Sequence, residues 1–312
     1  MGSWWSSAGG NTSKSTLPFG ITKISNSVYS FNLNSRRPEM EIVFIHGLPI
    51  SDNKEEFWKT WTAEEKDGDG NEVIWPVKWL REEFPRTRIW SLRYDSSTLK
   101  INPAGKIDGF TVGENLVQEM VNIAKVGQQS NQCPIVFVCH SLGGLVVKEM
   151  VIQAQKKCGR NKKYANLLQN IRGFHFYATP HDGSKLADLA SHLPDMEEMV
   201  KKLKVINDDL GRLNGEFERI GKEQYDNKWQ FAVIAETMKT ESHGFNAKVV
   251  EKASAQHGYN RFSAVKADHF GVCKPENRTS KSYKTFREFI LDIGMEAQTL
   301  TWVNPPENRL KQ

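Results

Sequence analysis

The chain has 312 residues, a formal net charge of +5 and 38% apolar residues. This length fits one large α/β domain, and the dispersed lysines and arginines predict a solvated surface, or a weak attraction to anionic membrane, and no nucleic-acid partner. No apolar run reaches the roughly 18 residues of a membrane span, and polar residues stand where a secretory signal would have its apolar core.

The four cysteines are Cys133, Cys139, Cys158 and Cys273. None belongs to a Cys-x-x-Cys pair, so we expect no metal site, and no motif indicates a cofactor. We interpret all four as reduced thiols, which are typical of a reducing compartment. The protein is therefore expected to be intracellular, either cytoplasmic or peripheral to an organelle membrane.

The first 20 residues are rich in Ser, Gly and Asn and predict a mobile tail, and residues 301–312 predict a second loose tail. The opening sequence MGSWWS fits the pattern for N-myristoylation at Gly2, with an unlipidated cloning remnant as the alternative. Between the tails we expect a single domain over residues 21–300.

Residues 28–33 alternate with period two and predict an early strand, and residues 42–45 form an apolar run typical of a strand covered on both faces. The second strand ends in His46-Gly47-Leu48. A strand that runs into His-Gly is typical of the loop that supplies one oxyanion-hole amide, which here belongs to Leu48. His46 is equally well interpreted as a structural histidine.

Residues 67–71 resemble the start of a calcium loop, but Glu72 and Lys78 stand where glycine and a bidentate acid are needed. We therefore predict a surface turn. Helices are predicted over residues 76–84 and 111–126, with a strand over 88–92 between them.

A buried strand over residues 135–138 runs into the sequence CHSLGG (139–144), and an apolar helix follows. Strand, tight turn and helix form the context of a nucleophile elbow, in which a serine is exposed at the carboxyl edge of a sheet. Cys139 departs from the Gly-x-Ser-x-Gly pattern, although cysteine is small enough for the turn to form. We predict Ser141 as the nucleophile and the Leu142 amide as the second oxyanion-hole donor.

A strand over residues 173–178 is followed by a long amphipathic segment, residues 185–222, with apolar residues three and four apart. This segment lies between two predicted strands, where many hydrolases insert a cap. We expect a helical lid over the serine, with a pair of core helices as the alternative.

Residues 230–235 predict a strand that ends at Glu236, residues 247–250 predict the last strand, and residues 284–294 predict a closing helix. Strands alternate with helices from residue 42 onward. This alternation predicts an α/β fold with a mainly parallel, doubly wound sheet.

A serine hydroxyl needs a histidine that accepts its proton and an acid that orients the histidine. In this fold class the chain order is serine, then an acid after a late strand, then a histidine. Ser141, Glu236 and His269 satisfy that order. Glu241 and Asp268 remain alternatives for the acid. The competing histidines are His175, His181, His243 and His257, which precede the acid or lie in loops ahead of the expected position.

These motifs resemble the serine-active-site-containing lipase-like family, which is related to the glycosylphosphatidylinositol inositol-deacylase group of α/β hydrolases. The resemblance runs from about residue 42 to 289 and includes HSLGGL (140–145), TPHDGS (179–184), ET (236–237) and DH (268–269). It implies an α/β-hydrolase fold and an ester or lipid hydrolase, with some members linked to phospholipid remodelling at intracellular membranes. It also implies Glu236 as the acid and His269 as the base. The family often has a second histidine where Asp182 stands.

We therefore predict a serine hydrolase that cleaves a carboxylic ester, with lipid esters as candidates, through an acyl-serine intermediate. The same triad would serve an acyltransferase or a lactonase, and a ligand-binding protein on a hydrolase scaffold is the non-enzymatic alternative. The expected partner is a small-molecule or lipid ester, with peripheral membrane contact as a further expectation.

Overall fold

The computed structural model describes residues 17–32, 38–48, 55–94, 111–128, 133–192, 197–224 and 229–297. The lipidation expected at Gly2, and residues 1–16 and 298–312 of the two expected tails, lie outside these ranges.

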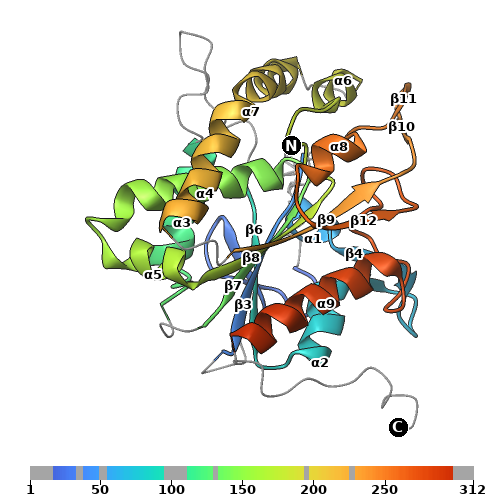
Figure 1. Cartoon of the computed structure of the whole chain (residues 1–312). Coiled ribbons are helices and arrows are strands. Elements are labelled where there is room, and N and C mark those ends of the chain that lie inside the picture. The colour runs from blue at the N-terminus through green and yellow to red at the C-terminus, as the bar shows by residue number, and fades with distance from the viewer. Residues whose placement is uncertain are drawn as a thin grey trace, which may run out of the picture.

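An eight-stranded sheet forms the centre of the described structure (Figure 1). The strand pairs from β6 to β12 are parallel, and β1 and β2 pair antiparallel at one edge. The spatial order is β1 (Thr22–Lys23), β2 (Val28–Asn32), β6 (Thr87–Leu92), β3 (Met40–Ile45), β7 (Ile135–His140), β8 (Ile171–Tyr177), β9 (Gln230–Glu236) and β12 (Arg261–Val265).

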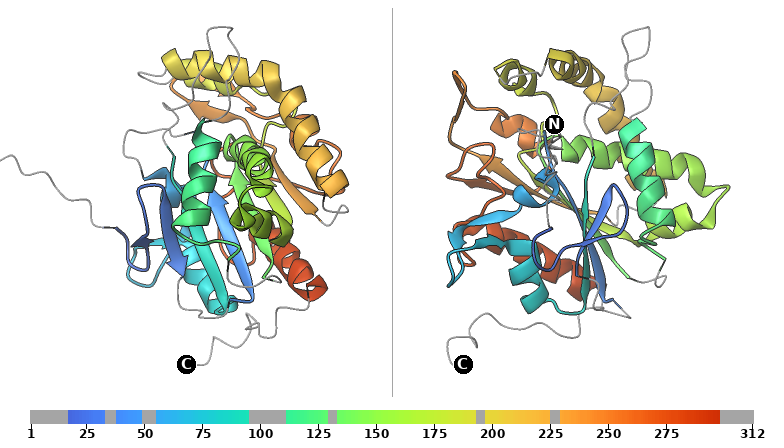
Figure 2. Two further views of the ribbon diagram at one scale, coloured as in Figure 1. Left: turned by 90° about the vertical axis from the view of Figure 1, so that its left-hand side faces the viewer. Right: turned by 180° about the vertical axis from the view of Figure 1, so that it is seen from behind.

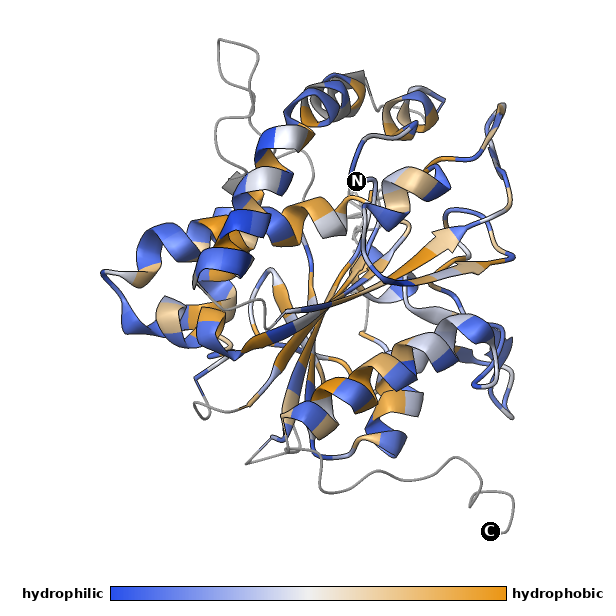
Figure 3. Ribbon diagram, in the orientation of Figure 1, coloured by the Kyte–Doolittle hydropathy of each residue, from blue (hydrophilic) through white to orange (hydrophobic). Residues whose placement is uncertain are grey.

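The central strands are buried on both faces, which explains their nearly continuous apolar sequences. Strands β3 and β7 are buried along their whole length. Alternate side chains of β3 enter two separate apolar clusters, with Val43 and Ile45 in one and Ile42 and Phe44 in the other. Figure 3 shows the apolar residues gathered on these strands and on the inner sides of the helices.

Helices cover both faces of the sheet (Figures 1 and 2). One face is covered by α3 (Thr111–Asn122), α4 (Gly143–Cys158), α5 (Lys162–Asn170) and α7 (Glu197–Gln224). The other face is covered by α9 (Lys281–Glu296), α2 (Arg81–Glu83), a π-helical turn (Pro76–Leu80) and the hairpin of β4 (Thr62–Lys66) and β5 (Glu72–Ile74). The remaining short elements are α1 (Glu56–Lys59), α6 (Leu186–Ser191), α8 (Lys252–Gln256), β10 (Thr240–Ser242) and β11 (Phe245–Ala247). The predicted doubly wound sheet is confirmed, and its architecture is that of an α/β hydrolase.

The segment expected to form a lid contains α6 and the long helix α7, between β8 and β9. The second half of α7 packs in the core, because the Phe217 ring lies 5.1 Å from Phe174 and 5.2 Å from Trp229. Helix α6 and the first part of α7 lie beyond the carboxyl ends of the central strands (Figures 1 and 2). The segment therefore combines a core helix with a portion placed where a cap would lie. The buried apolar side chains of α7 include Ile206, Leu210, Leu213, Phe217 and Ile220.

The prediction of a final strand over residues 247–250 is wrong. Strand β11 ends at Ala247, and the N–H groups of Val249 and Val250 donate to a carboxylate oxygen of Glu236 rather than to a neighbouring strand. The last strand of the sheet is β12, which pairs in parallel with β9. It escaped prediction because an edge strand that is only half-buried does not need a long apolar run.

Candidate active site

Ser141 lies in a sharp turn between β7 and α4. Its φ is 51°, in the left-handed region that is strained for a residue other than glycine. Its N–H donates to Tyr177 O at 2.9 Å, and its own carbonyl accepts from Gly144 N at 3.0 Å. A backbone held in this way presents the serine side chain at the carboxyl edge of the sheet, as the elbow motif predicts.

Two glycines allow the helix after the turn to approach the neighbouring loops. A Cβ on Gly143 would lie 2.4 Å from His46 O, and a Cβ on Gly144 would lie 2.2 Å from Thr179 Oγ1. Cys139 replaces the first glycine of the motif without blocking the turn, because it is the penultimate residue of β7 and is fully buried. Burial raises the pKa of the Cys139 thiol well above its usual value, so this thiol is not a competing nucleophile.

A continuous chain of hydrogen bonds joins Ser141, His269 and Glu236. The Ser141 hydroxyl donates to His269 Nε2 at 2.8 Å, and His269 Nδ1 donates to Glu236 Oε2 at 2.7 Å. The three residues are at most 1% exposed. They meet because β7, β9 and β12 all end at the same edge of the parallel sheet, although the residues are far apart in the sequence.

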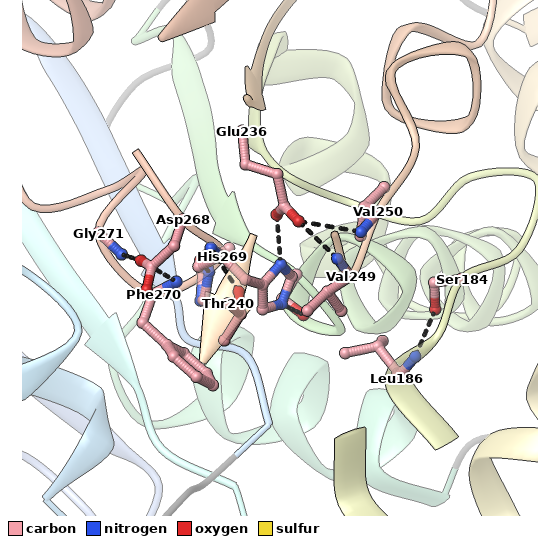
Figure 4. A network of polar contacts seen from close by, with 12 residues as sticks. Ser184, Leu186, Glu236, Thr240, Val249, Val250, Asp268, His269, Phe270 and Gly271 are labelled. Carbon is pink, nitrogen blue, oxygen red and sulfur yellow. Dashed lines mark hydrogen bonds and ion pairs between the residues drawn. The ribbon is translucent and has the colours of Figure 1, made fainter. Parts of the chain in front are cut away.

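The Glu236 carboxylate is held by the backbone as well as by His269 (Figure 4). Its Oε1 accepts the N–H of Val249 at 2.8 Å and the N–H of Val250 at 3.1 Å. These two donors fix the rotation of the carboxylate, so Oε2 faces the imidazole. The N–H groups of Val249 and Val250 bind this carboxylate, which explains why these two residues do not form a strand.

Two further residues hold the backbone of His269. The His269 N–H donates to Thr240 Oγ1 at 3.0 Å (Figure 4), and the His269 carbonyl accepts from His140 Nε2 at 2.7 Å. Burial, together with the nearby His269, lowers the pKa of His140 well below its usual value, so His140 stays neutral and keeps one ring proton to donate. Sequence reasoning missed both residues. The position of His140 directly before the serine was the one available signal.

Leu48 and Leu142 lie beside the serine. A Cβ on Gly47 would be 2.8 Å from Ser141 Cβ, so the backbone before Leu48 passes very close to Ser141. The N–H groups of Leu48 and Leu142 donate to no acceptor among the described residues. Both groups are therefore free to bind an oxygen of a ligand.

The alternative acids are used elsewhere. Glu241 is exposed and accepts from Asn246 Nδ2. Asp268 Oδ1 accepts the N–H groups of Phe270 and Gly271, so this carboxylate closes the turn after His269 (Figure 4). Neither carboxylate contacts the imidazole of His269 in the described structure.

The competing histidines lie away from Ser141. His243 is exposed in the turn between β10 and β11, and His175 is buried among core aromatic rings. His257 contacts Asp182 and Glu218. His181 is part of a separate buried cluster.

This cluster is centred on Lys148, which lies seven residues after Ser141 on α4. Lys148 Nζ donates to Asn214 Oδ1 at 2.6 Å and to His181 Nδ1 at 2.8 Å. Asn214 Nδ2 in turn donates to His181 O at 2.7 Å, which ties α7 to α4 and to the loop after β8. Burial lowers the pKa of Lys148 to about 7. The cluster was not anticipated from the sequence because its members come from three separate segments.

All four cysteines are free thiols. Among the described residues, no group of three or more His, Cys, Asp or Glu side chains is arranged to hold a metal ion. Within the same ranges, no helix combines the length and apolar character needed to cross a bilayer.

Residues 42–208 match the family described as "Putative serine esterase" (DUF676). Protein SERAC1 of Bos taurus is 28% identical over 303 residues, which cover 90% of this chain and 43% of that protein. Protein SERAC1 of Danio rerio is 29% identical over 273 residues, which cover 81% of this chain and 39% of that protein. The chain thus spans about two fifths of the length of the curated relatives it matches.

Two solved structures match this chain over most of its length. The mature lipase BlEst2 of Bacillus licheniformis is 18% identical, with a TM-score of 0.41, over 85% of this chain and 97% of that chain. Phospholipase PlaB from Legionella pneumophila is 14% identical, with a TM-score of 0.45, over 85% of this chain and 66% of that chain.

Proposed function

Because the chain belongs to the DUF676 family, whose description is "Putative serine esterase", we propose that it hydrolyses carboxylic esters with Ser141, His269 and Glu236 as its catalytic triad. The chain is a serine lipase-like α/β hydrolase, and the proposal adds the residues, the bond cleaved and the intermediate. The observation that carries it is the hydrogen-bond chain of 2.8 and 2.7 Å from the serine hydroxyl through the imidazole to the carboxylate.

In the first step, Ser141 Oγ attacks the ester carbonyl carbon while its proton moves to His269 Nε2. Glu236 Oε2 accepts the Nδ1–H of His269, which selects the tautomer whose Nε2 can receive a proton. The same carboxylate stabilises the imidazolium that forms. The N–H groups of Leu48 and Leu142 stabilise the negative charge on the former carbonyl oxygen.

In the second step, the tetrahedral intermediate collapses, and the alcohol leaves with the proton from His269. An acyl-Ser141 ester remains. Water then attacks this ester, His269 again accepts and returns the proton, and the carboxylic acid is released.

We further propose one domain over residues 21–300, in which α6 and the first part of α7 form a cap that selects the substrate. Their position beyond the carboxyl ends of the strands supports this role. Lipid esters are the candidate class, because an apolar acyl chain would suit the underside of a helical cap. Peripheral contact with a membrane follows as an expectation for a lipid substrate.

Acyl transfer is the second candidate activity, and one observation favours it. Ser141 has no exposed surface, and a site that excludes water protects an acyl-enzyme from hydrolysis. An alcohol bound in place of water would then accept the acyl group. Hydrolysis remains our first proposal, because it needs no second bound substrate. A lactone would be opened by the same steps.

Labelling with a fluorophosphonate probe tests the nucleophile. We expect the folded protein to be labelled at Ser141, and Ser141→Ala to lose both labelling and at least about 10⁴-fold in kcat on an activated ester. Ser263→Ala, which changes a half-buried serine on β12, serves as the matched control and should behave as the parent protein. Equal labelling of Ser141→Ala would contradict the triad, and absence of labelling in the parent protein would favour a ligand-binding role.

A panel of esters, lactones and phospholipids then defines the substrate, with alcohols of increasing length as acceptors. Products that contain the added alcohol would identify acyl transfer, and free carboxylic acid alone would identify hydrolysis.

A further inference from the structure

The proposed donor at Leu48 belongs to the peptide group that joins Gly47 to Leu48. The described chain has no cis peptide bond. In a planar trans peptide, the C=O and the N–H point in opposite directions. Whatever holds the carbonyl oxygen of Gly47 therefore determines where the Leu48 N–H points.

Two side chains hold this carbonyl oxygen. His46 Nδ1 donates to Gly47 O at 2.9 Å, and Tyr94 Oη lies 3.1 Å from the same oxygen. Tyr94 Oη is also 3.0 Å from His46 O, so its one proton is shared between two successive carbonyls of the loop. These contacts lie on the side of the peptide opposite to the Leu48 N–H.

The protonation of His46 suits this role. Burial lowers the pKa of His46 to about 4, so the ring is neutral near pH 7 and carries one proton. The Tyr94 N–H points at Nε2 at 3.4 Å, which assigns Nε2 as the acceptor and leaves the proton on Nδ1. Nδ1–H then donates to Gly47 O.

The fold brings these residues together through neighbouring strands. Strands β3 and β6 are parallel, with Ile45 paired to Leu92, so the residues that follow both strands emerge side by side. The rings of His46 and Tyr94 stack with centroids 4.4 Å apart and an interplanar angle of 10°. Both side chains are buried, and the loop they support passes close to Ser141 at Gly47.

We propose that Tyr94 and His46 are positioning residues for the oxyanion hole: they hold the Gly47 carbonyl from behind and so aim the Leu48 N–H at the reacting oxygen. Neither residue touches the substrate. The proposal rests on the triad mechanism proposed above, because an oxyanion exists only after Ser141 has attacked a carbonyl. A role confined to folding would support the loop without affecting the transition state selectively.

Tyr94→Phe is the principal test, because it keeps the stacked ring and removes only the hydroxyl. Loss of a whole oxyanion-hole donor lowers kcat about 10²- to 10³-fold. A donor that is retained but less well aimed should cost less, so we expect a loss of about tenfold in kcat with an unchanged KM. Tyr29→Phe is the matched control: it removes the hydroxyl of another buried tyrosine, which contacts Arg93 rather than the loop, and should leave kcat unchanged.

A trifluoromethyl ketone provides a readout that does not depend on turnover. Ser141 Oγ adds to its carbonyl carbon, the proton moves to His269, and the carbonyl oxygen becomes an anion in the oxyanion hole. The affinity of Tyr94→Phe for this inhibitor should fall by the same factor as kcat/KM. A change that only loosened the fold would lower the melting temperature without this parallel loss.

A pair of His46 variants provides a second test should Tyr94→Phe fail to fold. His46→Asn keeps an N–H donor close to the position of Nδ1, whereas His46→Leu has a similar volume and no donor. We expect kcat of the leucine variant to be about tenfold below that of the asparagine variant.

The outcomes separate this proposal from the one on which it rests. A parent protein that is labelled at Ser141, together with Tyr94→Phe of unchanged kcat and unchanged inhibitor affinity, would overturn the positioning role alone. Equal kcat values for the two His46 variants would do the same. A folded parent protein without Ser141 labelling would overturn both proposals.

Discussion

Replacing Glu236 with Gln tests the orientation of His269, the proposed catalytic base. The new side chain has one carbonyl oxygen and one NH₂ group. The N–H groups of Val249 and Val250 both point at the position of Oε1, so the carbonyl oxygen of the amide is drawn to that position. The NH₂ group must then face His269 Nδ1 and donate to it. That contact selects the tautomer with the proton on Nε2, which cannot accept the proton of Ser141.

The size of the effect follows from the alternative rotamer. Turning the amide over restores the productive tautomer but places NH₂ against two backbone N–H groups. Each buried donor left without a partner costs about 1–3 kcal/mol, so the turned amide lies about 2–6 kcal/mol higher in free energy. It is then populated at about one part in 30 to one part in 2 × 10⁴, and we expect Glu236→Gln to lower kcat by a factor in that range.

Initial rates on an activated ester, measured under saturating substrate, provide the assay. Glu241→Gln is the matched control, because Glu241 is the exposed carboxylate that follows the same strand, and we expect it to retain full activity. Both variants should unfold cooperatively in urea. A Glu236→Gln variant within threefold of the parent protein would refute the reasoning, since it would mean that the tautomer of His269 is not set by this carboxylate.

Three predictions concern stability. Burial lowers the pKa of Lys148 to about 7 in the folded protein, against 10.5 for an ordinary lysine, so this side chain binds more protons in the unfolded chain between these values. The contribution of Lys148 to the free energy of unfolding should therefore rise with pH from about 7 to 10.5, by at most about 4–5 kcal/mol. Lys148→Gln should remove this slope in urea unfolding, and the exposed Lys156→Gln on the same helix should retain it. Both ring nitrogens of the buried His175 have no hydrogen-bond partner among the described residues, so His175→Leu should raise the free energy of unfolding by about 1 kcal/mol, measured by urea denaturation. Glu83 is buried and accepts from Arg287 Nε at 2.7 Å and from two other side chains of the region around α9, so Glu83→Gln should lower the stability by about 3 kcal/mol in the same assay.

Each of these expectations has a clear contrary result. An equal pH dependence of unfolding in the parent protein and in Lys148→Gln between pH 7 and 10 would mean that Lys148 keeps its ordinary pKa. A lower stability of His175→Leu would mean that the aromatic contacts of the ring outweigh its unpaired nitrogens. Unchanged unfolding of Glu83→Gln would mean that α9 is held by its apolar face alone.

The central strands and the elbow were predictable because their signals are local. Strands β3 and β7 are buried on both faces, so their residues are apolar without interruption, and the turn at Ser141 requires small neighbours. The hydrogen bonds of the structure join Ser141, His269 and Glu236, the residues selected by their order in the chain, and their catalytic roles stay a prediction.

Other features depend on contacts between distant segments, which leave little trace in the sequence. Val249 and Val250 look like strand residues, yet their N–H groups bind a carboxylate. Strand β12 lies at the edge of the sheet and has polar neighbours in the sequence. It therefore lacks the apolar run that would have predicted a strand. His140 contacts His269, which lies 129 positions away in the sequence, and Tyr94 contacts two residues that lie 47 and 48 positions away. No local sequence pattern indicates contacts over such separations.

The full burial of Ser141 has a kinetic consequence. A serine with no exposed surface can meet an ester only after the groups that cover it have moved, so binding has to draw on an open form in which Ser141 is exposed. If only a fraction of the molecules is open at any moment, the apparent affinity for substrate is reduced by that same fraction. A substitution that favours the open form would then lower KM while leaving the distances within the triad unchanged. Selection of substrates would thus depend on the equilibrium between the forms in which Ser141 is covered and exposed, as well as on the shape of the site.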